Sequence, residues 1–406
     1  MVKKTVVQYT LESCVNCMKC VRICPASALS LVDNRINIDD NRCINCMRCV
    51  RVCPEKGLQA HGSPLSEIEN YDYTVCLVSG AISLHFPNKD VVEGVFYSIK
   101  NLGFDEVIDI SDVEGLMMEA TFRISDEMVT TSIITSFCPV LNRLVEDRYP
   151  MLLHHLAPLK YPHETAALVA RARLKDKGKV GIFNLCPCGS LLSIAKYPYH
   201  NMQYETDHAI AMTDIIPFIR KDTPAGLPPV DLCRQGLQSI NPALLPQRRT
   251  YLAADGYGKV TDIFNLAEFD LLNSFDLLYV FYCFNGCSGG DLMFGNSYLT
   301  HNNMENLTDG PSANLPDIPF ENMYTEHMLL PENEQQNIAD KLKFFRNVNE
   351  QLEQLPRLDC SACGFKTCRL MAEEIVNGRR TLHDCHILSA RRARERMEKK
   401  GVQETE

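Results

Sequence analysis

The pattern of apolar and polar positions in the middle of the chain predicts alternating strands and helices. Tyr73–Ser83 is an apolar run typical of a buried strand. Asp90–Asn101 has the apolar spacing of an amphipathic helix, and Glu106–Ile110 reads as a second strand after the turn at Gly103. A strand, a helix and a strand in this order predict a βαβ unit, and therefore an α/β fold with a parallel sheet.

Three later apolar runs, Ser132–Thr135, Lys179–Phe183 and Leu277–Tyr282, read as further strands, and each runs into cysteine. The carboxyl ends of strands in open α/β sheets are where ligand sites gather. We therefore expect these loops to converge on one cofactor; their cysteines are Cys138, Cys186, Cys188, Cys283 and Cys287.

The first 62 residues contain an internal duplication of cysteines. Each half has the form C-x2-C-x2-C-x3-C-P, in which the fourth cysteine serves the other of two 4Fe-4S clusters. Paired zinc knuckles would need two separated pairs of ligands instead. The segment resembles a bacterial two-cluster ferredoxin. The resemblance predicts two ligand sets: Cys14, Cys17, Cys20 and Cys53 for one cluster, and Cys24, Cys43, Cys46 and Cys49 for the other.

A different cysteine pattern, C-x2-C-x4-C-x16-C, lies in residues 355–390 and is formed by Cys360, Cys363, Cys368 and Cys385. The stretch before Cys385 has a partly apolar helical face, so the fourth thiolate would return after a helix. Gly364 permits a tight backbone approach to a cluster. A 4Fe-4S cluster is favoured, because the spacing resembles the small iron-sulfur domain of several corrinoid and hydrogenase-type proteins, and zinc is the alternative.

Composition fits a folded protein of two or three domains: 406 residues, 45% hydrophobic and 23% charged. Neither a secretory signal nor a membrane span is recognisable, which predicts a cytoplasmic protein. Nineteen cysteines in a reducing compartment predict metal ligation rather than disulfides. Cys76 and Cys233 lie outside these patterns and read as buried apolar residues. The net charge of -10 argues against nucleic acid as a partner.

The predicted organisation is a ferredoxin domain (1–62), an α/β domain (67–330), a helical spacer (331–354, with a helix from Asn333 to Gln354), an iron-sulfur domain (355–390) and a basic tail (391–406). The tail, SARRARERMEKK, reads as a basic helix without an apolar face. We expect it to be solvated or to dock a partner protein rather than to bind a membrane.

The three central loops, TSFCP, NLCPCGS and CFNGCSGG, resemble the cluster loops TSCCP, PCxxK and CxGGCxGG of iron-only (FeFe) hydrogenases. With the cysteine-rich tail, the resemblance is to the sensory or regulatory branch of that family. It implies an α/β hydrogenase-like core between an α+β ferredoxin domain and a small helical iron-sulfur domain. It also implies a central 4Fe-4S cluster held by Cys138, Cys186, Cys283 and Cys287, with Cys188 as a reserve for Cys186. Cys287 matches the thiolate that bridges to the two-iron half, and the cofactor-binding glycines would be Gly286, Gly289 and Gly290.

The chain departs from the family at the two-iron half of the cofactor. The proton-relay cysteine of the family falls at Phe137, which cannot transfer a proton. The lysine that hydrogen-bonds a cyanide falls at Gly189, and the glutamate three residues on falls at Leu192. A buried anionic diiron unit without a cationic donor is poorly compensated. We therefore expect an altered or absent diiron site.

These features predict an iron-sulfur electron-transfer or redox-sensing protein with four 4Fe-4S clusters and a redox protein or signalling complex as partner. The alternatives are a low-turnover or sensory FeFe hydrogenase that keeps the diiron subcluster, and an iron-sulfur scaffold protein. The infrared bands of iron-bound carbonyl and cyanide would separate the first two.

Overall fold

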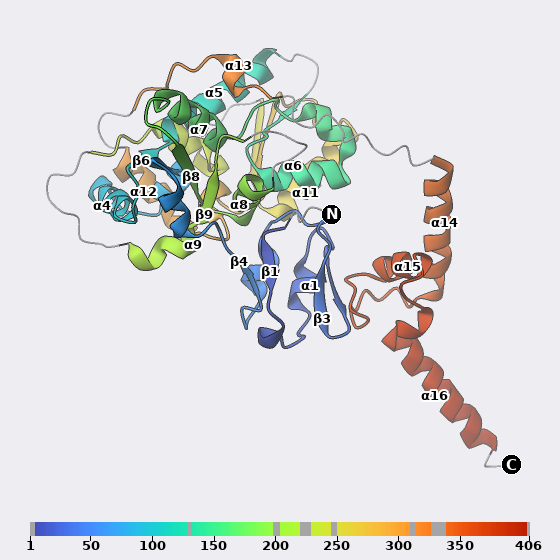
Figure 1. The fold of residues 1–406 in the computed structure, drawn as a ribbon. Helices are drawn as coiled ribbons and strands as arrows, with labels where there is room; N and C mark the ends of the chain where they lie inside the picture. Colours follow the sequence, from blue (N-terminus) through green and yellow to red (C-terminus); the bar gives the residue numbers. More distant parts are fainter. Residues whose placement is uncertain are drawn as a thin grey trace. The chain divides into compact units, whose positions relative to one another are not determined.

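The computed structural model describes residues 5–127, 132–197, 204–219, 229–244, 250–308, 313–325 and 338–403 (Figure 1). The chain forms two compact units. The larger contains residues 1–7, 44–47 and 60–331, and the smaller contains residues 8–43, 48–59 and 332–406. Each unit is described by itself.

The larger unit contains two parallel sheets. One has the order β6-β5-β8-β9 and the other the order β10-β11-β7. All their neighbouring strands run parallel, which confirms the expected α/β class. The strands are β5 (Tyr73–Val78), β6 (Glu106–Asp109), β8 (Val180–Cys186) and β9 (His208–Ala211) in the first sheet, and β7 (Ile133–Ile134), β10 (Tyr251–Asp255) and β11 (Leu277–Phe281) in the second.

Helices surround these strands (Figure 1). The helices of this unit are α3 (Gly80–Ser83), α4 (Lys89–Lys100), α5 (Ser111–Glu127), α6 (Pro139–Arg148), α7 (Pro162–Arg173), α8 (Gly189–Lys196), α9 (Met212–Ile215), α10 (Arg234–Ser239), α11 (Tyr257–Ala267), α12 (Thr300–Leu307) and α13 (Phe320–Met323). Short 3-10 helices are η2 (Leu65–Asn70), η3 (Pro150–His155), η4 (Ile216–Phe218), η5 (Pro242–Leu244), η6 (Gly286–Gly289) and η7 (Ser297–Leu299).

The expected βαβ unit is present as β5, α4 and β6, but the first strand is shorter than predicted. It ends at Val78, because the Ser79 side chain accepts a hydrogen bond from the amide of Ala81 and caps α3. Every residue of β8 is buried, as is usual for a parallel strand covered on both faces. Phe183 and Leu185 of β8 pack with Val95 and Ile99 of α4 in the main apolar core.

The smaller unit combines the ferredoxin-like strands and helices with the cysteine-rich C-terminal region. β2 (Leu29–Val32) and β3 (Arg35–Ile38) pair antiparallel, and β1 (Val7–Tyr9) pairs with β4 (Leu58–Ala60). Its helices are η1 (Leu11–Ser13), α1 (Lys19–Ile23), α2 (Arg48–Val52), α14 (Ile338–Gln354), α15 (Cys368–Val376), η8 (Leu382–Asp384) and α16 (His386–Gln403). The predicted spacer helix corresponds to α14, while its first residues and the last three of the tail lie outside the described residues.

The internal duplication of the N-terminal segment extends to its backbone. Equivalent residues of the two halves have the left-handed conformation that side chains seldom adopt. The pairs, with their φ angles, are Asn16 and Asn45 (52° and 51°), Met18 and Met47 (63° and 58°), and Ser27 and Lys56 (53° and 50°). The two halves therefore curl in the same way around their cysteines.

Candidate iron-sulfur sites

Four cysteines of the N-terminal segment line one cavity of about 380 Å³: Cys14, Cys17, Cys20 and Cys53. This is the first of the two ligand sets that the spacing predicts, with the fourth thiol coming from the second half of the duplication. Burial raises the pKa of the Cys20 thiol to about 11, and the sulfurs of Cys17, Cys14 and Cys53 add to the rise. Four thiolates in this space therefore need a positively charged centre among them, which a cluster of iron ions supplies.

The second N-terminal set remains a prediction from spacing, because its cysteines are divided between the two units. Cys24 and Cys49 are buried, and Cys43 and Cys46 are half-buried. The Cys24 sulfur accepts a hydrogen bond from the amide of Ala28 at 3.2 Å. Backbone N–H groups directed at cysteine sulfur are a usual feature of iron-sulfur ligation.

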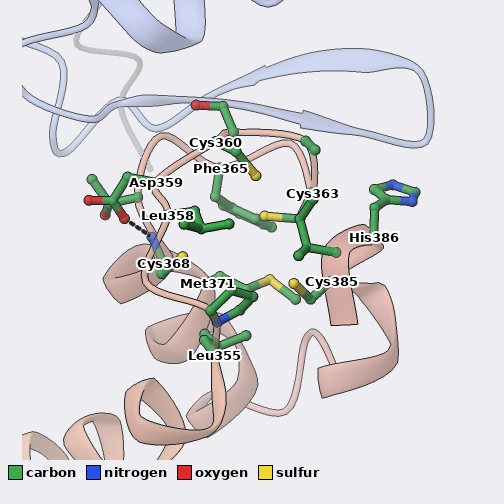
Figure 2. Close-up of a pocket in the computed structure, with 15 residues that line it drawn as sticks. Leu355, Leu358, Asp359, Cys360, Cys363, Phe365, Cys368, Met371, Cys385 and His386 are labelled. Carbon is green, nitrogen blue, oxygen red and sulfur yellow. Dashed lines mark hydrogen bonds between the residues drawn. The ribbon is translucent and has the colours of Figure 1, made fainter. Parts of the chain in front are cut away.

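The C-terminal cysteines surround a second cavity, of about 340 Å³ (Figure 2). Its lining includes all four members of the predicted set, Cys360, Cys363, Cys368 and Cys385. Figure 2 shows the side chains of Leu358, Phe365 and Met371 among the sulfur atoms. Asp359 holds the loop by accepting a hydrogen bond from the Cys368 amide at 2.6 Å. The helix expected before Cys385 is α15, which ends at Val376, so the chain makes a further turn before that cysteine.

The backbone at Cys360 repeats the conformation of the ferredoxin loops. Asp359 and Ser361, on either side of Cys360, have left-handed φ angles of 46° and 61°. Asn16 and Met18 flank Cys17 in the same way. When left-handed residues alternate with others along the chain, successive backbone N–H groups point into the same concave surface. Such surfaces bind anions and occur at many iron-sulfur sites. This shared backbone conformation favours a cubane over zinc at the C-terminal site.

Burial raises the pKa of the Cys363 thiol, and the neighbouring Cys385 and Cys360 contribute to the rise. These thiols, like that of Cys20, stay protonated in the absence of a cation, and binding of a metal group would favour their deprotonation. Among the residues that the structure describes, no group of three or more His, Cys, Asp or Glu side chains is close enough to hold a single metal ion.

In the larger unit, two cysteines of the central loops lie at helix N-termini. Cys138 precedes α6 and Cys188 precedes α8. Burial raises the pKa of both thiols, that of Cys188 to about 12, while backbone N–H groups at the start of each helix lower it. The positive end of a helix favours thiolate and an anionic cluster. Both positions are therefore suited to ligands.

The thiols of Cys138, Cys188, Cys283 and Cys287 form one electrostatic group. Burial is the main reason that the pKa values of Cys283 and Cys287 are raised, and the charges of Cys138 and Cys188 raise both further. The three loops therefore meet, as expected, although their strands belong to two sheets rather than one.

Cys186, the expected second-loop ligand, has different surroundings from Cys188. It is the last residue of β8, is fully buried, and its thiol donates to the Asn184 carbonyl at 3.5 Å. Besides burial and Cys188, the groups that raise its pKa are Cys76 and Glu164, not Cys138, Cys283 or Cys287. The reserve candidate, Cys188, rather than Cys186 therefore shares its electrostatic surroundings with Cys283 and Cys287, and the choice of second-loop ligand stays a prediction.

The glycines of the third loop are required by close backbone contacts. A Cβ on Gly286 would lie 2.0 Å from the Ile240 carbonyl oxygen, and one on Gly290 would lie 2.3 Å from that of Pro187. At Gly289 the neighbour is the carbonyl oxygen of Phe284, 1.8 Å away. Gly290 thus brings the third loop against the second loop, while the role of the three glycines toward a cofactor remains a prediction.

The residues at the two family-specific positions are apolar or lack a side chain. Phe137 is buried, and its ring meets that of Tyr279 edge-on at 6.4 Å between centroids. At Gly189 a Cβ would lie 2.3 Å from the Met47 methyl carbon. If the motif PCxxK is aligned on Cys188 instead of Cys186, the lysine falls at Leu191 and the glutamate at Ile194. Neither alignment supplies a cation.

Two carboxyl groups near this site, the buried Glu114 and the half-buried Asp109, were missed from the sequence. Glu114 accepts hydrogen bonds from the Ser79 hydroxyl at 2.5 Å and the Gly80 amide at 3.1 Å, and its charge raises the pKa of Cys287. Asp109, at the end of β6, accepts a hydrogen bond from Ser111. The only feature of the sequence that could have indicated them is the position of Asp109 near the end of a predicted strand.

We expect Asp109 to make stability depend on pH. Burial raises the pKa of its carboxyl to about 7, with bonds from Ser111 and Ser83 lowering it and Asp112 raising it further. The folded state then binds a proton that the unfolded chain releases, so stability should fall from about pH 4 to about pH 7 by at most roughly 4 kcal/mol. Asp109→Asn should flatten this slope in anaerobic urea unfolding, and the exposed control Asp176→Asn should not. An unchanged slope in Asp109→Asn would refute the assignment.

Cys76 and Cys233 are both 1% exposed, as expected for buried apolar residues.

Within the residues described, no helix combines the length and apolar character needed to cross a membrane.

Three family models match the chain. Residues 6–76 match the 4Fe-4S dicluster domain, residues 72–224 the C-terminal domain of the iron-only hydrogenase large subunit, and residues 355–387 a putative Fe-S cluster domain. The hydrogenase match includes Cys138, Cys186 and Cys188 and ends before the third loop.

Among curated proteins, the uncharacterized protein MJ0119 of Methanocaldococcus jannaschii is 43% identical over 53 residues, which are 13% of this chain and 24% of that protein. The chain thus spans about a quarter of the length of this relative. Among solved structures, a variant of the FeFe-hydrogenase HydA1 from Chlamydomonas reinhardtii is 15% identical, with a TM-score of 0.42, over 62% of this chain and 88% of the other. An FeFe-hydrogenase structure concerned with oxygen inactivation is 16% identical, with a TM-score of 0.44, over 60% and 87%.

The matched domains follow one another in the order that the sequence predicts, with a dicluster domain before the hydrogenase domain and a single Fe-S domain after it. The predicted ligand cysteines other than Cys283 and Cys287 lie within these matches. Residues 72–224 are thus similar to the C-terminal domain of the iron-only hydrogenase large subunit, and the three matched domains together indicate an iron-sulfur electron-transfer protein related to the FeFe hydrogenases.

Proposed function

We propose that the protein holds four 4Fe-4S clusters and transfers or senses electrons without hydrogen chemistry. Two clusters would lie in the ferredoxin-like segment, one in the C-terminal site and one at the central loops. The diiron subcluster that the family carries would be altered or absent. Cys138, Cys188, Cys283 and Cys287 would hold the central cube, with Cys188 in place of the Cys186 first expected.

The observation that carries this proposal is that the residues at the two family-specific positions, Phe137 and Gly189, carry no polar side-chain group. Hydrogen chemistry needs a group that moves protons beside the metal, and Phe137 offers an inert ring held against Tyr279. An anionic diiron unit also needs a cationic donor. Gly189 has no side chain, and Leu191 has no donor. The four thiols suffice for a cube, whereas the groups for the two-iron half are missing.

A contact within the larger unit supports electron transfer to the central site. Met47 directly follows Cys46, and its side chain fills the space beside Gly189, which directly follows Cys188. Asn45, on the other side of Cys46, donates to the Ser193 hydroxyl of α8 at 3.0 Å. The contact between Met47 and Gly189 thus connects the predicted ferredoxin ligand Cys46 to the predicted central ligand Cys188.

We further propose that a redox protein, or a larger signalling complex of the kind associated with the sensory branch, exchanges electrons where clusters reach the surface. Among the predicted ligands, Cys17 and Cys360 are exposed. They belong to two different sites, one in the ferredoxin-like segment and one in the C-terminal loop. A partner docked at either would approach a cluster closely, and a cytoplasmic location would supply such partners.

Restoring cysteine at position 137 tests the proposal. If a diiron subcluster were present and only the relay were missing, Phe137→Cys should raise hydrogen turnover by roughly a hundredfold or more. We expect no hydrogen evolution or uptake in either form, because the site also lacks the cationic donor. Phe137→Ala is the matched control for the loss of the ring. Turnover in Phe137→Cys alone would support the second candidate, a slow or sensory hydrogenase, which the retained glycine-rich third loop favours.

A further inference from the structure

We propose that the C-terminal cysteine loop and the ferredoxin-like fold form a direct electron junction, in which Gly364 sets the approach and Lys366 sets the reduction potential of the cluster that Cys24 would hold. This inference rests on the proposed function, since it needs cubes in both places. When bound, the two cubes would exchange single electrons, so that one is oxidised as the other is reduced, with no bond made or broken. The hydrogen-bonded segments that carry this inference lie in the smaller unit.

Three hydrogen bonds join the ligand-bearing segments. The Leu31 amide donates to the Gly364 carbonyl at 2.8 Å. The Lys366 ammonium donates to the Cys24 carbonyl at 2.5 Å, and the Arg22 guanidinium donates to the Cys360 carbonyl at 3.5 Å. Gly364 follows Cys363, and Lys366 is two residues before Cys368. Two of these bonds therefore end on the carbonyl oxygen of a predicted ligand cysteine, Cys24 in one set and Cys360 in the other.

The shape of the contact depends on glycine. Gly364 has a φ angle of 90°, and a Cβ at this residue would lie 2.0 Å from the Leu31 carbonyl oxygen. The sequence interpretation took Gly364 to permit an approach to a cluster, whereas the structure shows an approach to the backbone of β2. Val32, the next residue of β2, packs against the small apolar core of the C-terminal region.

The charges at this contact suit two anionic groups brought close together. Arg42 forms an ion pair with Glu373 of α15 at 2.9 Å. Arg22 and Lys366 place cationic groups directly on carbonyl oxygens of ligand cysteines. A cation beside a cluster stabilises the reduced, more negative form, so it raises the reduction potential. Lys366 is partly buried, which limits screening by solvent and salt.

The shape of the junction is tested with Gly364→Ala in the full chain. The matched control is Gly378→Ala, because Gly378 also has a positive φ, 73°, but no atom lies within 4 Å of its Cβ position. We expect the reduced wild type and Gly378→Ala to show magnetic coupling between the C-terminal and ferredoxin cubes by EPR. Gly364→Ala should lose this coupling while keeping its iron. Wild-type protein with all cubes bound but no coupling would overturn the junction and leave the proposed function intact.

The charge is tested with Lys366→Met, which keeps the length of the side chain, against Arg391→Met on the exposed part of α16. Lys366→Met should lower the midpoint potential of one ferredoxin cube by about 59 mV, a tenfold shift for a one-electron couple. Arg391→Met should leave it unchanged. If Gly364→Ala also loses iron, the midpoint potential of Lys366→Met decides whether the junction exists. An unchanged potential in Lys366→Met with intact cubes would refute the junction. Carbonyl or cyanide bands in the wild type would instead refute the proposed function alone.

Discussion

Cys188→Ser should lower the iron content from about sixteen to about twelve per chain, whereas Cys186→Ser should leave it near sixteen. The two cysteines are two residues apart, yet their surroundings differ. Cys188 precedes α8 and its charge raises the pKa of Cys283 and of Cys287. Cys186 ends β8, and the charges that raise its pKa include those of Cys76 and Glu164 but not those of Cys283 and Cys287. Only the first position offers both a ligand group and the positive end of a helix.

Iron and sulfide analysis of the anaerobically reconstituted proteins gives the count, and EPR shows which cube is lost. Cys186→Ser serves as the matched control, because it makes the same chemical change at a fully buried cysteine in the same segment. A loss of four irons in Cys186→Ser with none in Cys188→Ser would return the ligand role to Cys186.

Cys385→Ser should remove the C-terminal cube and unfold the region around it. The buried part of the apolar core there is small: Val348, Leu355, Phe365, Met371, Ala372 and Cys385 itself. So small a core contributes little stability without a metal group, and ligation then supplies much of the folding free energy, on the order of several kcal/mol. Hydrogen exchange in α15 should become at least tenfold faster.

The control for this experiment is Cys76→Ser, a buried cysteine outside every predicted ligand set. It should keep all the iron and leave exchange in α15 unchanged. Metal analysis also decides between the two predicted occupants of the site. A loss of about four irons supports a cubane. The loss of one zinc ion at unchanged iron would establish the zinc alternative.

The cysteines that line the two cavities could be predicted because cysteine spacing is a local property. The curl around Cys17 is encoded within a few residues, and both it and the equivalent curl at Cys46 were found from spacing alone. The choice between Cys186 and Cys188 as the ligand depends on where the strand ends and on contacts with distant segments, which cysteine spacing does not show. The strand expected at Lys179–Phe183 in fact continues to Cys186 as β8, so that Cys186 lies inside the packed sheet. The apolar run VGIFNLC contained this signal.

Contacts between distant segments could not be predicted from one sequence. The three strands that lead to the central loops divide between two sheets, and pairing partners are set by packing rather than by local pattern. The neighbours of Gly286, Gly290 and Gly364 are backbone atoms of remote segments. A sequence shows that glycine stands there, but not which carbonyl oxygen excludes a side chain.

The most direct test of the central claim is an infrared spectrum of the anaerobically purified protein after incubation with a synthetic diiron precursor. The proposal predicts no bands from iron-bound carbonyl or cyanide, together with about sixteen irons per chain, four for each cube. Phe137 and the missing lysine leave the two-iron unit without a proton relay and without a cationic donor. Carbonyl and cyanide bands that persist after removal of the excess precursor would show a hydrogen-binding centre and contradict the account.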